Sequence, residues 1–202
     1  TGLLVDYMEA LFLFLFGTNW NSHLAHSSFM NILGTTGLYF FLKEYQLKLS
    51  HIVFYCLSFA TLCYPLSGTP FAYIHAYIFS ILAIFNLLIA IKEKNRYLWF
   101  LFPYVCFFAF LSMQTPTAYI LLILLTILIY YFKIEKNNKN LIFFLFGSLI
   151  SLTIFFLFLY FTETPIINFI YQYILFPLTI GEDRIVSKAI AYIGLADQLN
   201  LK

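Results

Sequence analysis

Charged residues are scarce in this sequence. Only 10% of its 202 residues are Asp, Glu, Lys or Arg, whereas a soluble domain carries about 25%. Hydrophobic residues make up 62%. A surface with so little charge would not stay dissolved in water, so the lipid bilayer is the expected solvent. A net charge of +2, without a basic patch of interleaved aromatics, gives no reason to expect a nucleic-acid partner.

The sequence also lacks several familiar functional patterns. Its three cysteines, Cys56, Cys63 and Cys106, are an odd number scattered through apolar runs, so we expect apolar filler rather than disulfides or a metal cluster. There is no Walker A loop, no Gly-x-Ser-x-Gly and no dinucleotide fingerprint. No signal peptide is recognisable, and the chain opens at Thr1 inside a pattern, so we expect a piece of a longer chain.

Long apolar runs are what the sequence does contain. A bilayer core about 30 Å thick needs roughly 20 helical residues. Six runs qualify as candidate spans: His23–Leu42, His51–Leu66, Phe71–Ile91, Tyr97–Met113, Thr117–Phe132 and Leu141–Phe161. The second, fourth and fifth are short and would have to stand upright or borrow flanking residues. We therefore predict an all-α polytopic membrane helix bundle with about six spans in residues 23–161.

Positive charge alternates between the breaks that separate these runs. Every second break is basic, with Lys43 and Lys48, then Lys92, Lys94 and Arg96, then Lys133, Lys136 and Lys139. The remaining breaks carry little or no positive charge. The positive-inside rule places all three basic loops in the cytoplasm without adjustment, which leaves the other breaks on the outer face.

Two further segments are predicted to lie on that outer face. Residues 1–22 hold acids near the start and an apolar run ended by Gly17, which predicts a short interfacial helix with Trp20 at headgroup level. Residues 162–202 form the second outer segment. Within it, Ile166–Ile180 is short for a crossing and contains Pro177, so we predict an interfacial or re-entrant stretch.

Ionisable groups gather near the predicted outer face, where they are candidates for chemistry. Asp6 and Glu9 share a helix face and could act as base, acid or metal ligands, or simply favour a helix N-terminus. His23 and His26 also share a face, but a metal would need further ligands, so an interhelical polar contact competes with that interpretation. His75 lies about one turn into its span, either facing a water-filled cavity or bonding a carbonyl.

Four stretches together resemble a known enzyme family: "DYMEALFLFLFGTNWNSHLAHSSFMN", "SGTPFAYIHAYIFSILAIFNLLIAIKEKN", "FLSMQTPTAYI" and "FIYQYILFPLTIGEDR". They are similar to the many-pass membrane glycosyltransferases of the C structural class, in the bacterial branch of lipid-A-sugar and protein O-mannosyl transferases. The resemblance implies a polyprenyl-phosphate-linked sugar donor and a reaction at the periplasmic face. It also implies an amphipathic helix in the first large outer loop, which "DYMEALFLFLFG" would match.

The resemblance also suggests roles for particular residues. A carboxylate would deprotonate the acceptor hydroxyl, with Asp6 and Glu9 as the catalytic candidates. His75, His26, Gln114 and Arg184 are the candidates for substrate binding, three of them able to stabilise the phosphate leaving group. Two departures from the family pattern stand out. The family's essential acidic residue is expected before Thr1, and the turn where a basic residue is often found here reads Met113-Gln114.

The resemblance also leads to expectations about binding partners and cellular location. The partners would be membrane lipid, the polyprenyl-phosphate sugar donor, and a glycan or lipid acceptor. No cofactor is assigned, and a divalent metal is left open. The protein is expected in the bacterial inner membrane. The alternatives are an O-antigen polymerase or ligase, a transporter or flippase of a lipid-linked saccharide, and a non-catalytic scaffold. A midplane nearly free of charge favours interfacial chemistry over transport.

Overall fold

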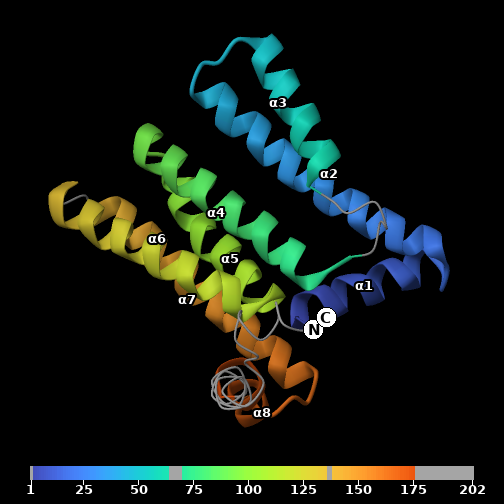
Figure 1. The fold of residues 1–202 in the computed structure, drawn as a ribbon. Coiled ribbons are helices and arrows are strands. Elements are labelled where there is room, and N and C mark those ends of the chain that lie inside the picture. The colour runs from blue at the N-terminus through green and yellow to red at the C-terminus, as the bar shows by residue number, and fades with distance from the viewer. Residues whose placement is uncertain (1, 64–69, 136–137, 176–202) are drawn as a thin grey trace, which may run out of the picture. The chain divides into compact units, whose positions relative to one another are not determined.

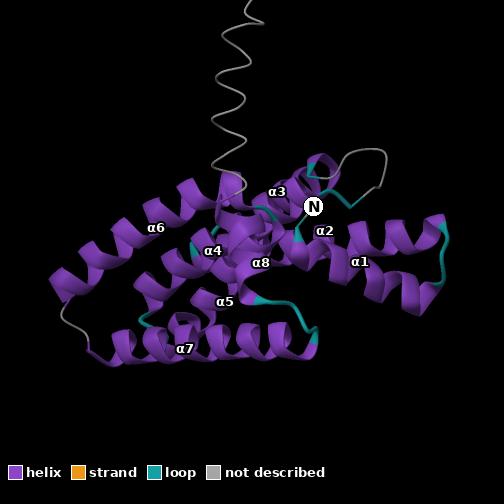
Figure 2. Cartoon of the chain, turned by 90° about the horizontal axis from the view of Figure 1, so that it is seen from below, coloured by secondary structure: helices purple, strands orange, loops and turns teal. Residues whose placement is uncertain are grey.

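The computed structural model describes residues 2–63, 70–135 and 138–175, and within these ranges the protein is helical and contains no strand (Figures 1 and 2). The chain divides into two compact units, Thr1–Ile154 and Phe155–Lys202. The helices are α1 (Leu3–Phe16), α2 (Trp20–Glu44), α3 (Leu49–Leu62), α4 (Ala72–Glu93), α5 (Arg96–Ser112), α6 (Gln114–Glu135), α7 (Asn138–Phe161) and α8 (Ile166–Ile170), and a π-helical turn (Tyr171–Leu175) follows α8. The predicted all-α class is confirmed.

Each of the six predicted spans overlaps one helix, although His51–Leu66 continues beyond the end of α3 into residues outside the described ranges. Among the described residues, three segments are long and apolar enough to cross a membrane. These are Ala72–Glu93, Thr117–Glu135 and Lys139–Phe161. Helices α3 and α5 have 14 and 17 residues, short of the roughly 20 that a bilayer core requires. Helix α2 has 25 residues but interleaves His, Ser, Asn and Thr with its apolar positions. The protein is therefore a membrane protein with three well-defined candidate spans.

Helix α4 is the centre of the first unit, where it packs against α2, α5 and α6. Ala76, Ala83 and Ala90 recur every seven residues along it and are fully buried. Such small side chains let neighbouring helix backbones approach closely, which is how helices associate in a lipid environment. Trp99 of α5 is also fully buried, and its ring stacks on Tyr131 of α6 at a centroid distance of 5.0 Å.

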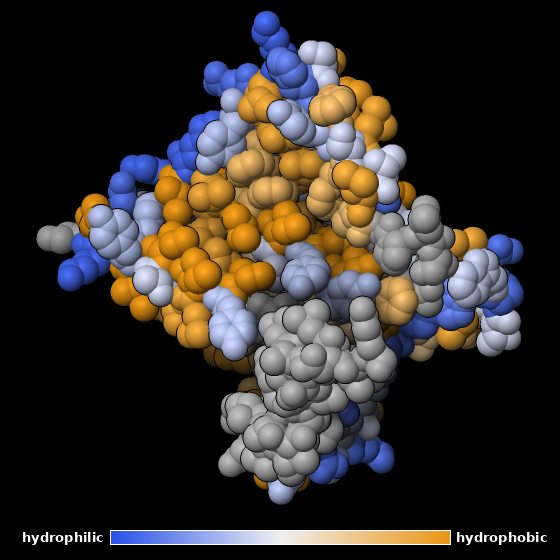
Figure 3. Space-filling view, viewed as in Figure 1, coloured by the Kyte–Doolittle hydropathy of each residue, from blue (hydrophilic) through white to orange (hydrophobic). Residues whose placement is uncertain are grey.

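Hydrophilic residues gather at helix ends in the first unit, with apolar surface over the helices between them (Figure 3). At one end, Lys92 Nζ lies 3.6 Å from Glu44 Oε1, and Lys94 Nζ lies 3.2 Å from Glu135 Oε2. The C-terminal ends of α2, α4 and α6 therefore meet. This end carries residues of all three basic breaks that the sequence grouped on one side, with Lys43, Lys92 and Lys133 in the last turns of α2, α4 and α6.

The second unit contains the segment predicted to be interfacial or re-entrant. Helix α8 has only five residues and continues into the π-helical turn. The ring of Phe169 contacts those of Phe155 and Tyr173 at centroid distances of 4.7 and 4.5 Å. The end of the predicted Ile166–Ile180 segment, with Pro177, lies outside the described residues.

Two helical glycines allow a direct test of close packing in the first unit. A Cβ at Gly147 of α7 would lie 2.2 Å from the backbone oxygen of Phe100, which cannot move without shifting a helix. We expect Gly147→Ala to lower stability by about 1–3 kcal/mol, because the overlap outweighs the better helix propensity of alanine.

The matched control is Gly37→Ala, where the added Cβ meets only the flexible tip of Leu82. Thermal unfolding of the detergent-solubilised variants measures both changes. Equal melting temperatures for the two variants would contradict the close approach of α7 to α5.

Candidate acid–base site

The turn between α1 and α2 brings the candidate residues together. Gly17 closes α1 with a φ of 85°, which an L side chain rarely adopts, and its N–H donates to the Leu13 carbonyl. Asn19 caps α2, since its side-chain oxygen accepts from the backbone N–H groups of Asn21 and Ser22 at 2.9 and 3.3 Å. The chain therefore reverses within three residues, and α1 packs back along α2.

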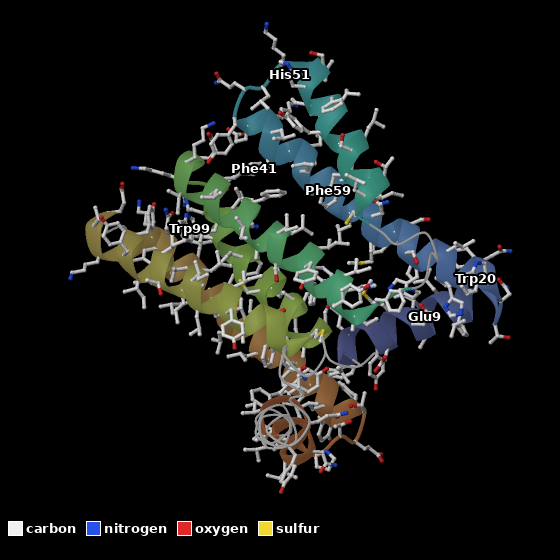
Figure 4. The ribbon with its side chains drawn as sticks, viewed as in Figure 1. Glu9, Trp20, Phe41, His51, Phe59 and Trp99 are labelled. Atoms are coloured by element: carbon white, nitrogen blue, oxygen red, sulfur yellow. The ribbon has the colours of Figure 1, made fainter. Side chains whose placement is uncertain are left out.

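This hairpin sets Glu9 against two histidines. Glu9 lies about two turns before the reversal and His26 about two turns after it, so the two positions face each other across the helix pair. Glu9 Oε2 lies 2.6 Å from His26 Nδ1, and Glu9 Oε1 lies 2.5 Å from His23 Nδ1. The first is a hydrogen bond, and the second is an ion-pair contact without good hydrogen-bond direction. Figure 4 places Glu9 between α1 and α2, at the same end as Trp20.

A third histidine extends the cluster into α4. His26 Nε2 lies 3.0 Å from His75 Nε2, and His75 Nδ1 lies 2.8 Å from the Phe71 carbonyl oxygen at the start of α4. The ring of Phe12 stacks on His26 at a centroid distance of 4.9 Å and covers it from the α1 side. One polar chain therefore runs from Glu9 through His26 and His75 to the backbone of α4.

The cluster has a buried arm and an accessible arm. His26 and His75 are 0% exposed. Glu9 keeps 18% of its side chain exposed and His23 keeps 32%. His23 Nε2 makes no hydrogen bond within the part of the chain that the structure describes. A substrate could therefore reach His23 and the edge of Glu9, whereas the two inner imidazoles are sealed from it.

Among the residues predicted from the sequence, Glu9, His26 and His75 come together, and the others do not join them. Asp6 is exposed, although it shares a helix with Glu9. Gln114 begins α6 and is half-buried without a place in the cluster. Arg184 lies outside the described residues. The spacing of three between His23 and His26 predicted either a metal pair or an interhelical polar contact, and it was the signal that both side chains would face one partner.

The arrangement does not fit a divalent metal. Zinc needs three or four ligand atoms directed at one point. Here each donor faces a single partner: His26 uses one ring nitrogen on Glu9 and the other on His75. Across the described ranges, no group of three or more His, Cys, Asp or Glu side chains has the geometry to hold a metal ion. The cluster is instead suited to holding and moving protons.

Comparisons of the chain with protein families, with curated proteins and with solved structures find no match.

The Asn19 cap can be tested apart from the cluster that it positions. We expect Asn19→Ala to cost about 0.5–2 kcal/mol of stability, because two backbone N–H groups at the start of α2 lose their acceptor. Asn21→Ala is the control, since Asn21 is exposed and contributes only its backbone N–H to the cap. Thermal unfolding of the purified protein measures the difference. A control that is destabilised as much as Asn19→Ala would refute the capping role.

Proposed function

We propose that the protein is an integral membrane glycosyltransferase that moves a sugar from a polyprenyl-phosphate donor to a glycan or lipid acceptor. It belongs to a bacterial inner membrane, and the six predicted spans cross that membrane with the basic loops in the cytoplasm. The reaction then takes place at the periplasmic face. The proposal combines the sequence resemblance with one structural observation, the Glu9–His23 pair at the accessible edge of a buried carboxylate–histidine cluster.

The position of the cluster supports an interfacial reaction. His75 lies in the first turn of α4, whereas Lys92 lies in its last turn beside Glu44. A helix rises about 1.5 Å per residue, so this stretch of α4 is about 26 Å long, close to the thickness of a bilayer core. The cluster and the basic end of α4 therefore suit opposite membrane surfaces. A lipid-linked donor keeps its phosphate and sugar at one such surface.

The chemistry follows from the protonation of His23. A carboxylate oxygen only accepts, so the contact with Glu9 favours the His23 tautomer with its proton on Nδ1. Its Nε2 then carries a free lone pair, the form that acts as a general base. Nε2 takes the proton of the acceptor hydroxyl, and the acceptor oxygen attacks the anomeric carbon of the sugar. The bond from that carbon to the phosphate oxygen breaks, and polyprenyl phosphate leaves with the electron pair.

The decisive experiment measures this lipid product, because it is the same whichever sugar is transferred. Membranes that contain the protein are incubated with a panel of polyprenyl-phosphate monosaccharides and an acceptor extract, and released polyprenyl phosphate is quantified. We expect Glu9→Gln and His23→Gln to lower its release by about 100-fold or more, since general-base catalysis contributes at least that much.

His51→Gln is the matched control. His51 is an exposed histidine at the start of α3, far from Glu9 in Figure 4, and its loss should leave release unchanged. If release is seen only with a parallel panel of polyprenyl-diphosphate saccharides, and the product is polyprenyl diphosphate, the result would support the O-antigen polymerase or ligase alternative. Movement of intact lipid-linked saccharide between leaflets without bond cleavage would support a carrier. Either result would overturn the proposal.

The proposed orientation predicts which surface is labelled by membrane-impermeant maleimide. In a background with Cys56, Cys63 and Cys106 changed to Ala, Thr18→Cys in the α1–α2 turn should react from the periplasm. Lys94→Cys should react only after the membrane is opened, because the positive-inside rule retains Lys94 in the cytoplasm. The reverse pattern would place the cluster on the cytoplasmic side and exclude a periplasmic reaction.

A further inference from the structure

The buried arm of the cluster constrains its own protons. The Phe71 carbonyl can only accept, so His75 Nδ1 must carry a proton to bond it at 2.8 Å. If His75 is neutral, its Nε2 then bears a lone pair directed at His26 Nε2, 3.0 Å away. Two lone pairs facing each other at that distance would repel, so one proton must lie between the two imidazoles.

The same reasoning applies at the carboxylate. The separation of 2.6 Å between Glu9 Oε2 and His26 Nδ1 requires a proton between these atoms. The chain of Glu9, His26 and His75 therefore holds three protons in three hydrogen bonds. An ionised carboxylate and two neutral histidines supply only two protons. The cluster carries one more, and its net charge is zero.

Neutrality agrees with the burial of this arm. An unpaired charge enclosed with His26 and His75, both 0% exposed, would carry the free-energy cost of its lost hydration. An ionised Glu9 beside a singly protonated imidazole pair avoids that cost, and so does a protonated Glu9 beside two neutral imidazoles. The two forms differ in what they offer His23, because the negative charge of an ionised Glu9 stabilises the positive charge that His23 gains as a base, and a neutral carboxyl does so far less.

We propose that His75 is a positioning residue for the Glu9–His23 pair: by sharing one proton with His26, it keeps Glu9 ionised and holds the second Glu9 oxygen against His23. His75 acts through His26 and contacts no substrate. The Phe71 carbonyl fixes the His75 tautomer, so the backbone at the start of α4 sets the proton arrangement of a site on α1 and α2. Among the described residues, the other titratable groups close to His75 and His26 are Glu9 of α1 and His23 of α2.

The proton count is testable by nitrogen NMR of the protein labelled with [15N]histidine, without any substrate. We expect three of the four ring nitrogens of His26 and His75 to be protonated at neutral pH, with one proton correlated to both Nε2 atoms. His75→Gln and His51→Gln assign the signals, and His51 serves as the ordinary exposed histidine. If only two of these four ring nitrogens were protonated, the third proton would lie on Glu9. If all four were protonated, both His26 and His75 would be positively charged. Either count overturns the proposal.

The catalytic consequence rests on the proposed function and has its own readout. His75→Phe keeps the ring volume but removes the shared proton, and we expect kcat to fall by up to about 100-fold with KM nearly unchanged. His75→Gln should recover part of the loss, because its amide N–H can donate to His26 Nε2. If the Phe variant fails to fold, the wild-type spectrum and the activity of the Gln variant still test whether His75 positions the Glu9–His23 pair. Absence of all transferase activity beside the expected spectrum would reject the function and leave the proton arrangement standing.

Discussion

The hydrogen bond between Glu9 and His26 is the interaction on which the rest of this site depends. A carboxylate that is largely withdrawn from water is tolerated only where donors replace its hydration. Two imidazoles from α2 surround Glu9, and a third from α4 extends the chain to the backbone. One acidic side chain thereby ties three helices together. The chain reversal at Gly17 and Asn19 makes this contact possible, because it places Glu9 of α1 beside the histidines of α2.

The bilayer explains the remaining distribution of side chains. Where no water reaches the helices, association depends on close backbone packing, and the buried alanines of α4 supply it. Helices α4, α6 and α7 satisfy the length and composition of a membrane span, whereas the polar residues of α2 set that helix apart. The helix that carries His23 and His26 is therefore the one least suited to lipid on all sides, which agrees with a place beside a polar site.

The proposed activity of this cluster rests on the difference between its two arms. The enclosed imidazoles cannot meet a substrate, so their chemistry is limited to holding protons and orienting Glu9. In the proposed reaction, the partly exposed His23 exchanges a proton with a substrate hydroxyl while Glu9 stabilises the charge that results. A histidine oriented by a carboxylate is a recurrent way to build a general base. Here the carboxylate is itself oriented by a further histidine pair, which makes the start of α4 part of the proposed working site.

The sequence by itself determined the solvent, the helical class and the approximate bounds of the long helices, because hydrophobic length and charge position are local properties of the chain. It also identified Glu9, His26 and His75 as unusual polar groups, since an ionisable side chain in an apolar run is conspicuous without a structure. Only the tertiary structure decided that these residues meet, that Asp6 does not join them and that His23 is the accessible imidazole beside Glu9. Those outcomes depend on how α1 folds back on α2 and where α4 begins beside them. Such contacts are set by packing between distant segments, and no periodicity within one helix records them.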